Sequence, residues 1–340
     1  MLRPMARRAR PRPRLPRPPC RCAGLATCAS THEVDERRPN VVGMPKAELE
    51  SALVELGMKP FVARQVWRWL YTQGATSFAA MHNVSKRNRA LLAERFSLWT
   101  GGIDSDELSE DGTRKWLLRF DAQTAVEAVY IPEEARSRGS MCLSSQCGCT
   151  LACSFCRTGT QKITRNLSSA EIVGQLLTAR RALGGFGRPV NAEQPRAVSN
   201  IVMMGQGEPL YNYRNVKAAL RIAMDNEGLS ISRRRITLST SGVVPLIEKL
   251  GHDLSVGLAI SLHAVTDELR DELVPANRQW PIAELLAACR AYPKRSGTRR
   301  ITFEYILIDG INDSLGEARE LVRLLHNIPS LVNLIPFNVR

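Results

Sequence analysis

The first part of the chain has the apolar period of amphipathic helices. Leu49, Leu53 and Leu56 recur at intervals of three or four residues, which places them on one face of a helix. Pro45 suits the first position of that helix, because the first N–H groups of a helix have no partner within it. Two more segments have the same period, so the pattern predicts a small helical domain. The three predicted helices span 45–58, 61–72 and 86–96.

The pattern then changes to that of strands. Two short segments, 114–120 and 126–131, flank a turn near Ala122 and predict a β-hairpin. From about Met141, short apolar strands alternate with helical segments. The predicted strands are 141–144, 201–204, 235–240, 256–262, 301–307 and 332–335. The predicted helices are 169–183, 212–225, 243–250, 281–291 and 314–327.

This alternation predicts an α/β fold with a parallel sheet, either open or curled into a partial barrel. Ser168 and Glu171 have the spacing of a capping box at the start of helix 169–183. In such folds, ligands bind at the carboxyl ends of the strands. We divide the chain into a basic tail, a helical accessory domain, a β-hairpin linker and an α/β core, which span 1–40, 41–100, 101–134 and 135–340.

Composition sets limits on the protein class. A chain of 340 residues with 44% hydrophobic residues can bury a large core, which excludes wholesale disorder. No stretch approaches about 18 uninterrupted apolar residues, so no transmembrane helix is predicted. The formal net charge of +14 indicates a polyanionic partner. Lys and Arg clusters are either solvated faces or contacts to RNA phosphates; they lie at 233–235, at Lys162 with Arg165, and at 294–295 with 299–300.

Much of the charge lies at the start of the chain. Residues 1–32 contain eight Arg, six Pro and no acidic residue. This density of proline excludes a regular helix, so the segment is either a disordered tail or an organelle transit peptide. It also lacks the apolar segment of a secretory signal. We therefore expect a cytoplasmic protein, or a mitochondrial or plastid protein if 1–40 is a transit peptide.

The cysteines point to metal chemistry. Five of the nine lie within fifteen residues, in a chain without a secretory signal. Cys149, Cys153 and Cys156 are separated by four and three positions, so their thiolates can converge from one loop. Three thiolates leave one iron of a four-iron cluster open, and S-adenosylmethionine can bind that iron. The alternative is a zinc site completed by Cys147 or by a distant His. Cys289 follows the apolar period of helix 281–291, which indicates a core position.

Several short segments together carry a resemblance to a known family. They are CLSSQCGC at 142–149, CSFC at 153–156, MMGQGEP at 203–209, TLSTSG at 237–242, AISLH at 259–263 and NLIPFN at 333–338. From about residue 38 onward, the chain resembles the radical S-adenosylmethionine superfamily. Within it, the chain is similar to the RlmN/Cfr group, which methylates adenosine in RNA. The resemblance implies a partial (β/α)6 barrel, preceded by the helical domain and the hairpin.

The resemblance also implies the site residues. Cys149, Cys153 and Cys156 would hold a [4Fe-4S] cluster. Glu208 would offer its carboxylate to the ammonium group of S-adenosylmethionine, next to glycines that let a ligand approach the backbone. The implied cofactor-binding residues are Gly207, Glu208, Ser239, Ser261, Leu262, His263 and Asn338. A Ser at a strand end is, taken alone, often only a turn former.

Two residues are catalytic by resemblance. Cys142 would be the thiol that resolves a covalent protein–RNA adduct and ends in a disulfide; otherwise it is a small buried hydrophobic residue. Glu127 would accept a proton, or else it is a solvent-facing carboxylate on a strand. Cys147 departs from the family, which usually has an aliphatic residue at this position.

The implied reaction uses two molecules of S-adenosylmethionine per cycle and a methyl-cysteine intermediate to methylate C2 of adenosine in 23S rRNA and tRNA. The implied partners are these RNAs and an electron donor such as flavodoxin or ferredoxin, and we expect a monomer. The methyl-carrying cysteine should lie beyond Asn338, yet no cysteine follows Cys289, so we expect that a C-terminal segment is missing. Two alternatives stay open, namely an inactive RNA-binding remnant that holds a cluster and a zinc-stabilised nucleic-acid-binding protein.

Overall fold

The computed structural model describes residues 38–133, 138–187, 197–293 and 300–338. These ranges all fall within one unit, Val34–Arg340. The predictions made for the tail, and for the basic residues Lys294, Arg295 and Arg299, concern positions outside the described residues.

The helical region contains the three predicted helices, α1 (Lys46–Glu55), α2 (Pro60–Tyr71) and α3 (Lys86–Arg95). Leu49 and Leu53 of α1 are fully buried, as the apolar period indicates. Pro45 differs slightly from its prediction, because it is the N-cap residue and the helix begins at Lys46. The helices pack onto the core through their apolar stripe, and a 3-10 turn, η1 (Phe78–Ala80), precedes α3.

A nine-stranded sheet forms the centre of the fold, in the order β1-β2-β3-β4-β7-β8-β9-β10-β11. Its six parallel strands confirm the partial (β/α)6 barrel. They are β4 (Arg138–Cys142), β7 (Val198–Met203), β8 (Ile236–Thr240), β9 (Gly257–Ser261), β10 (Ile301–Leu307) and β11 (Ser330–Pro336). The predicted hairpin is β2 (Arg114–Arg119) with β3 (Ala125–Glu133), and the turn at Ala122 joins them.

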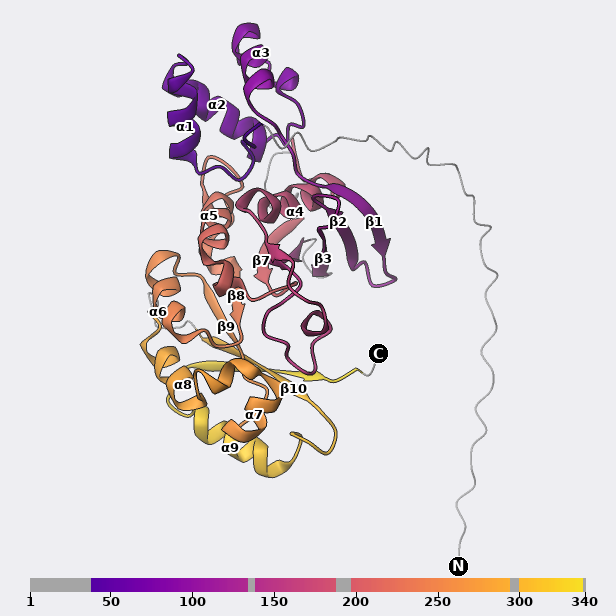
Figure 1. Cartoon of the computed structure of the whole chain (residues 1–340), viewed down its shortest axis with the longest axis vertical. Coiled ribbons are helices and arrows are strands. Elements are labelled where there is room, and N and C mark those ends of the chain that lie inside the picture. Colours follow the sequence, from indigo (N-terminus) through magenta and orange to yellow (C-terminus); the bar gives the residue numbers. More distant parts are fainter. Residues whose placement is uncertain (1–37, 134–137, 188–196, 294–299, 339–340) are drawn as a thin grey trace, which may run out of the picture. The chain divides into compact units, whose positions relative to one another are not determined.

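The antiparallel part of the sheet is larger than the sequence indicated. A further strand, β1 (Gly102–Leu108), pairs with β2, and β3 pairs with β4. The hairpin is therefore continuous with the barrel sheet rather than a separate linker. Figure 1 shows β1, β2 and β3 side by side near α4.

Helices follow the parallel strands, as expected for βα units. Figure 1 shows α5, α6 and α8 in succession along the same side of the molecule. The helices are α4 (Ser169–Ala182), α5 (Tyr213–Met224), α6 (Val244–Asp253), α7 (Asp267–Leu273), α8 (Ile282–Ala291) and α9 (Leu315–Leu325). Ser168 and Glu171 form the predicted capping box of α4, whereas α7 was not predicted. None of the helices in the described ranges is long and apolar enough to cross a bilayer.

The register of the strands fixes which side chains share a face. Cys142 pairs with Val129 on one side and with Val202 on the other, and Val202 pairs with Thr237. Paired residues point to the same side of a sheet, and so do residues two positions apart in a strand. The same face therefore carries Glu127, Cys142, Ser239, Ser261, Glu304 and Asn333.

The opposite face of the sheet is apolar and closed. It carries alternate residues such as Met141, Ile201, Leu238 and Phe303, each at most 1% exposed. Burial of this face against the helices stabilises the barrel through the hydrophobic effect. The polar face is thereby left free to form a binding site.

Candidate active site

The segment with Cys149, Cys153 and Cys156 is a loop that is closed at its base. A short ladder of β5 (Gln146–Cys147) with β6 (Arg165–Asn166) joins the two ends of the loop. The Gln146 amide strengthens this closure, because it donates to Asn166 Oδ1 at 2.7 Å. Gly148, with φ of 81°, allows the close approach of the chain ends, since a Cβ there would lie 2.3 Å from the Lys162 carbonyl oxygen.

The three cysteines line one cavity of about 260 Å³ at the carboxyl ends of the parallel strands. The loop packs on α7 through the Ser154 N–H, which donates to the Leu273 carbonyl at 3.3 Å. Burial raises the pKa of Cys153 to about 12 and also raises the pKa of Cys149. Metal binding at these thiols would thus release protons, because iron binds the thiolate.

The thiols are not arranged around a single ion. In the part of the chain that the structure describes, no three His, Cys, Asp or Glu side chains converge as ligands of one metal ion. A four-iron cluster does not require such convergence, because each thiolate binds a different iron atom. Three soft thiolates that border one cavity are a donor set that fits such a cluster.

Glu208 is a buried acid in the lining of this cavity, with 2% of its surface exposed. Its carboxylate caps the turn that follows β7, and it accepts from the Leu210 N–H at 3.1 Å and from the Ser241 N–H at 2.8 Å. Burial raises the pKa of Glu208, and these hydrogen bonds act against the rise. The carboxylate is therefore fixed in position, with its charge directed toward the cavity.

The glycines beside Glu208 permit tight packing of the chain, in addition to the ligand approach that the sequence predicts. A Cβ at Gly207, which has φ of 93°, would lie 2.4 Å from Gln146 Cβ. A Cβ at Gly205 would lie 2.7 Å from Ser144 Oγ. Both glycines thus allow the β7 turn to contact the start of the cluster loop.

The strand ends contribute three more of the predicted residues. Ser239, Ser261 and His263 line the cavity with Glu208 and the cysteines. The His263 ring contacts Phe155 edge to face, with 4.4 Å between ring centroids. Its Nδ1 accepts from the Ile306 N–H at 3.1 Å, and burial lowers the pKa of His263 to about 3. This imidazole is therefore neutral at physiological pH.

Two of the predicted cofactor residues lie apart from the cavity lining. Leu262 is fully buried, and its N–H donates to the Glu304 carbonyl at 3.0 Å. Asn338 follows β11 and is exposed. Five of the seven predicted cofactor residues thus lie together in the cavity lining, namely Gly207, Glu208, Ser239, Ser261 and His263, and the structure does not bring Leu262 and Asn338 into it.

Cys142 and Glu127 share the polar face of the sheet with these residues. Burial raises the pKa of Cys142 to about 11, so its thiol is protonated at neutral pH. Glu127 is exposed on β3, and its carboxylate lies 3.5 Å from Lys115 Nζ. Neither side chain is part of the cavity wall itself.

Arg165 does not have the free charge that its basic cluster suggested. Its guanidinium binds Asp121 and Glu171, each at 2.6 Å. This pairing joins the end of the cluster loop to the hairpin turn and to α4. Lys162 is exposed, as are Arg233, Arg234 and Arg235.

Cys289 is fully buried in α8, as predicted. The Cys147 thiol faces the Ala125 carbonyl oxygen at 3.7 Å. The six cysteines of the described ranges are all free thiols, so a disulfide bond is not supported there.

Sequence reasoning missed two charged residues at the site. Arg270 of α7 is fully buried and donates to the carbonyl oxygens of Ser241, Ser261 and Leu262. Glu304 of β10 lines the cavity with 8% of its surface exposed. Each residue has one weak sign in the sequence. Glu304 is a charged residue within an apolar strand, and Arg270 is a charged residue shortly after one.

Comparison with known proteins agrees with this geometry. Residues 39–98 match the family described as the ribosomal RNA large subunit methyltransferase N-terminal domain, and residues 143–324 match the radical SAM superfamily. The dual-specificity RNA methyltransferase RlmN of Acidiphilium cryptum is 56% identical over 308 residues, which cover 91% of this chain and 79% of the relative. The RlmN of Gluconobacter oxydans is 56% identical over 301 residues, or 88% of this chain and 74% of the relative.

A solved structure shows the same fold. The radical SAM methyltransferase from Sphaerobacter thermophilus superposes with a TM-score of 0.81 at 43% identity, and the match covers 88% of this chain and 86% of that one. The match of both regions, at this identity and coverage, shows that the chain belongs to the RlmN family of radical S-adenosylmethionine methyltransferases.

Proposed function

We propose that this protein methylates C2 of adenosine in 23S rRNA and in tRNA through a methyl-cysteine intermediate, and uses a [4Fe-4S] cluster and two molecules of S-adenosylmethionine per cycle. One observation carries the proposal. Three cysteines from one loop and the buried Glu208 border the same cavity, in a chain that is 56% identical to a dual-specificity RNA methyltransferase.

Cys149, Cys153 and Cys156 would hold the cluster, and the open side of the cavity would admit the cofactor. A cluster bound there would supply the electron for reductive cleavage of the cofactor. Glu208 would bind the ammonium group of the cofactor, because its carboxylate is fixed by two backbone N–H groups. Ser239, Ser261 and His263 would orient the nucleoside part, with Gly207, Leu262 and Asn338 as neighbours.

Cys142 and Glu127 would act on the RNA adduct. Both lie on the polar face of the sheet, which supports a shared role. A thiol with a pKa of about 11 needs a base to become a nucleophile at neutral pH. Glu127, with its exposed carboxylate, would take the proton from C2 of adenine.

A basic groove supports RNA as the substrate. It encloses about 510 Å³ and combines Trp67 and Tyr213 with five cationic side chains, Lys46, Arg214, Lys217, Arg221 and Lys249. We call it the α5 groove, because Arg214, Lys217 and Arg221 recur at helical spacing along α5. Cations interleaved with aromatic rings suit the phosphates and bases of RNA.

The same proposal includes a monomeric cytoplasmic enzyme that takes electrons from flavodoxin or ferredoxin.

The test begins with the cluster. After anaerobic reconstitution, wild-type protein should bind iron and sulfide and show the brown chromophore, while Cys149→Ala, Cys153→Ala and Cys156→Ala should not. Cys147→Val is the matched control, because Cys147 is a neighbouring thiol outside the proposed ligand set and Val has a similar size. Undiminished iron in the three Ala variants would contradict the assignment.

The second part tests the product. Because the methyl-carrying cysteine is expected beyond Asn338, the test uses a chimera in which the C-terminal segment of a related RlmN, with its cysteine, follows Arg340. RNA treated anaerobically with this chimera, reductant and cofactor is digested, and its adenosines are analysed by mass spectrometry. We expect 2-methyladenosine from both rRNA and tRNA. Methylation at another atom, or of only one RNA class, would contradict the proposed specificity.

A further inference from the structure

The cavity contains a second buried carboxylate, which has no role in the reaction described above. Glu304 lies on β10 and lines the cavity with Glu208 and the three cysteines. Asn333 Nδ2 donates to its Oε2 at 2.6 Å. In the described part of the chain, no Lys or Arg forms an ion pair with it.

The strands hold Glu304 in place. Its backbone carbonyl accepts from the N–H groups of Leu262 and His263, at 3.0 and 3.3 Å. Its register partners are Ser261 on β9 and Asn333 on β11, so all three side chains point to the polar face of the sheet. The carboxylate is therefore aimed at the space that the cofactor would fill.

The charges around the cavity do not balance. None of the described residues that line it is Lys or Arg, and His263 is neutral because burial lowers its pKa to about 3. The buried guanidinium of Arg270 donates to backbone carbonyls and to Asn277. Two carboxylates and three thiols thus border a cavity whose described lining residues include no cationic side chain. Buried carboxylates are costly unless a cation compensates them.

S-adenosylmethionine brings two positive charges, an ammonium and a sulfonium. The proposed function assigns Glu208 to the ammonium. Glu304 and the sulfonium then remain without an assigned partner of opposite charge. We propose that Glu304 recognises the positive charge of the sulfonium, and that it thereby selects S-adenosylmethionine over the uncharged S-adenosylhomocysteine. This inference rests on the proposed function and deepens it.

Such a selection would serve the reaction. The step that methylates a cysteine converts S-adenosylmethionine into S-adenosylhomocysteine, which has the same adenosine and amino acid parts but a neutral thioether. Both molecules fit the same cavity, so shape separates them poorly. A carboxylate in a low-dielectric site binds the sulfonium cation more tightly than the neutral thioether. This difference favours exchange of S-adenosylhomocysteine for a second molecule of S-adenosylmethionine.

The test compares the two compounds on one variant. Glu304→Gln is isosteric and keeps an oxygen for the Asn333 amide while it removes the charge. On cluster-loaded protein under nitrogen, calorimetry should show that the variant loses roughly tenfold in affinity for S-adenosylmethionine. Its affinity for S-adenosylhomocysteine should change by less than about threefold, so the ratio of the two affinities collapses.

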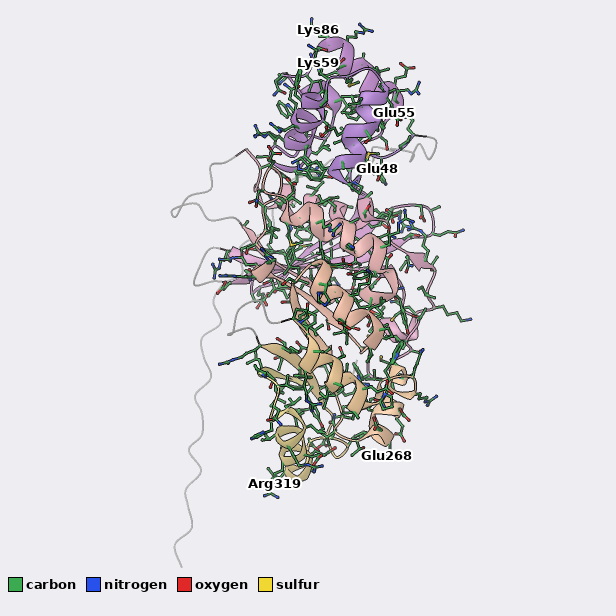
Figure 2. All side chains as sticks on the ribbon, turned by 90° about the vertical axis from the view of Figure 1, so that its left-hand side faces the viewer. Glu48, Glu55, Lys59, Lys86, Glu268 and Arg319 are labelled. Carbon is green, nitrogen blue, oxygen red and sulfur yellow. The ribbon has the colours of Figure 1, made fainter. Side chains whose placement is uncertain are left out.

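A matched control and a second variant complete the design. Glu268 of α7 is exposed and points away from the protein (Figure 2), so Glu268→Gln should keep the wild-type ratio. Glu304→Asp keeps the charge and should retain most of the selectivity, and it carries the test if the Gln variant fails to fold or to hold iron. Iron content and thermal unfolding are measured for each variant.

The outcomes separate the alternatives. Equal losses for both compounds would show that Glu304 contacts a part they share, such as the ribose, and would overturn the inference. Unchanged affinities, or a ratio lost in the Asp variant to the same extent as in the Gln variant, would also overturn it. If wild-type protein holds its cluster but binds neither compound, the proposed function itself fails, and this inference fails with it.

Discussion

At the scale of single residues, Glu208 and His263 show how burial sets charge in the cavity. Glu208 stays anchored by two backbone N–H groups, whereas none of the described residues gives His263 a partner that would stabilise a proton. The imidazole instead accepts a hydrogen bond from Ile306. The cavity therefore offers negative charge and neutral acceptors, which suits a cationic ligand.

Replacement of Glu208 by Gln should weaken cofactor binding and spare the cluster. The variant loses a charge-assisted hydrogen bond to the ammonium, worth about 1.5–3 kcal/mol, or roughly tenfold or more in affinity. Anaerobic calorimetry measures the affinity, and iron analysis confirms that the cluster is present. Equal affinities in wild type and variant would count against the role of Glu208.

The buried His263 predicts a pH dependence of stability. Its pKa is about 3 in the folded protein, whereas an unfolded histidine titrates near 6.5. The unfolded chain therefore binds an extra proton below about pH 6.5, so stability falls as the pH is lowered toward 3. Between pH 7 and pH 5, the free energy of unfolding should fall by about 2 kcal/mol because of this single group.

The variant His263→Asn isolates this effect, because Asn keeps an acceptor for the Ile306 N–H and does not titrate. Denaturant unfolding at pH 7 and at pH 5 should show a smaller loss of stability in the variant than in wild type. Parallel pH profiles for the two proteins would show that His263 does not titrate as its burial requires.

At the scale of elements, the sequence predicted the helices and strands that have a clear apolar period. β10 begins and ends where the pattern placed it, because Ile301, Phe303 and Tyr305 recur with the period of two that is typical of a strand. β1 was missed because it is largely exposed and rich in acids. Its stability depends on cross-strand pairs such as Arg114 with Asp106, at 2.7 Å, which only the register reveals.

The site shows the same division between local and long-range information. Cys149, Cys153, Cys156 and Glu208 lie in short motifs with a chemical meaning, so the sequence was enough to find them. Glu304 and Arg270 belong to a strand and a short charged helix, and their place in the site depends on pairing and burial. A sequence pattern does not show which carbonyl oxygens a buried guanidinium will meet.

Arg270 should matter for stability because it links two strand ends. Its guanidinium satisfies the carbonyl oxygens of Ser241, Ser261 and Leu262 in the interior. Arg270→Met would leave buried acceptors without donors, at a cost of about 1–3 kcal/mol each. We expect the free energy of unfolding to fall by about 3 kcal/mol or more, measured by denaturant titration.

The control is Arg319→Met on α9, where Figure 2 shows the side chain at the surface. An exposed site of this kind should change stability by less than about 0.5 kcal/mol. If Arg270→Met were as stable as this control, the hydrogen bonds of Arg270 would contribute little to the fold.

At the scale of the whole molecule, charge in the sequence and charge free to bind RNA are different quantities. Arg165 is neutralised within the protein by Asp121 and Glu171. In the α5 groove, Lys217 and Lys249 share Asp253, at 2.8 and 3.4 Å. Among the described residues, Arg214 and Arg221 have no acidic partner, and both are exposed. These two arginines are therefore the groove cations with the most charge left for phosphates.

Loss of both arginines should weaken RNA binding in a way that depends on salt. Each phosphate contact contributes about 0.7–0.9 to the slope of log affinity against log salt, because binding releases counterions. Arg214→Ala combined with Arg221→Ala should therefore reduce the slope by roughly 1.4–1.8 and lower affinity most at low salt. Fluorescence anisotropy with labelled tRNA at several KCl concentrations measures both effects, and Arg319→Ala should match wild type. Parallel salt curves for the double variant and wild type would place the RNA away from the α5 groove, while cofactor binding in the barrel should stay unchanged in either case.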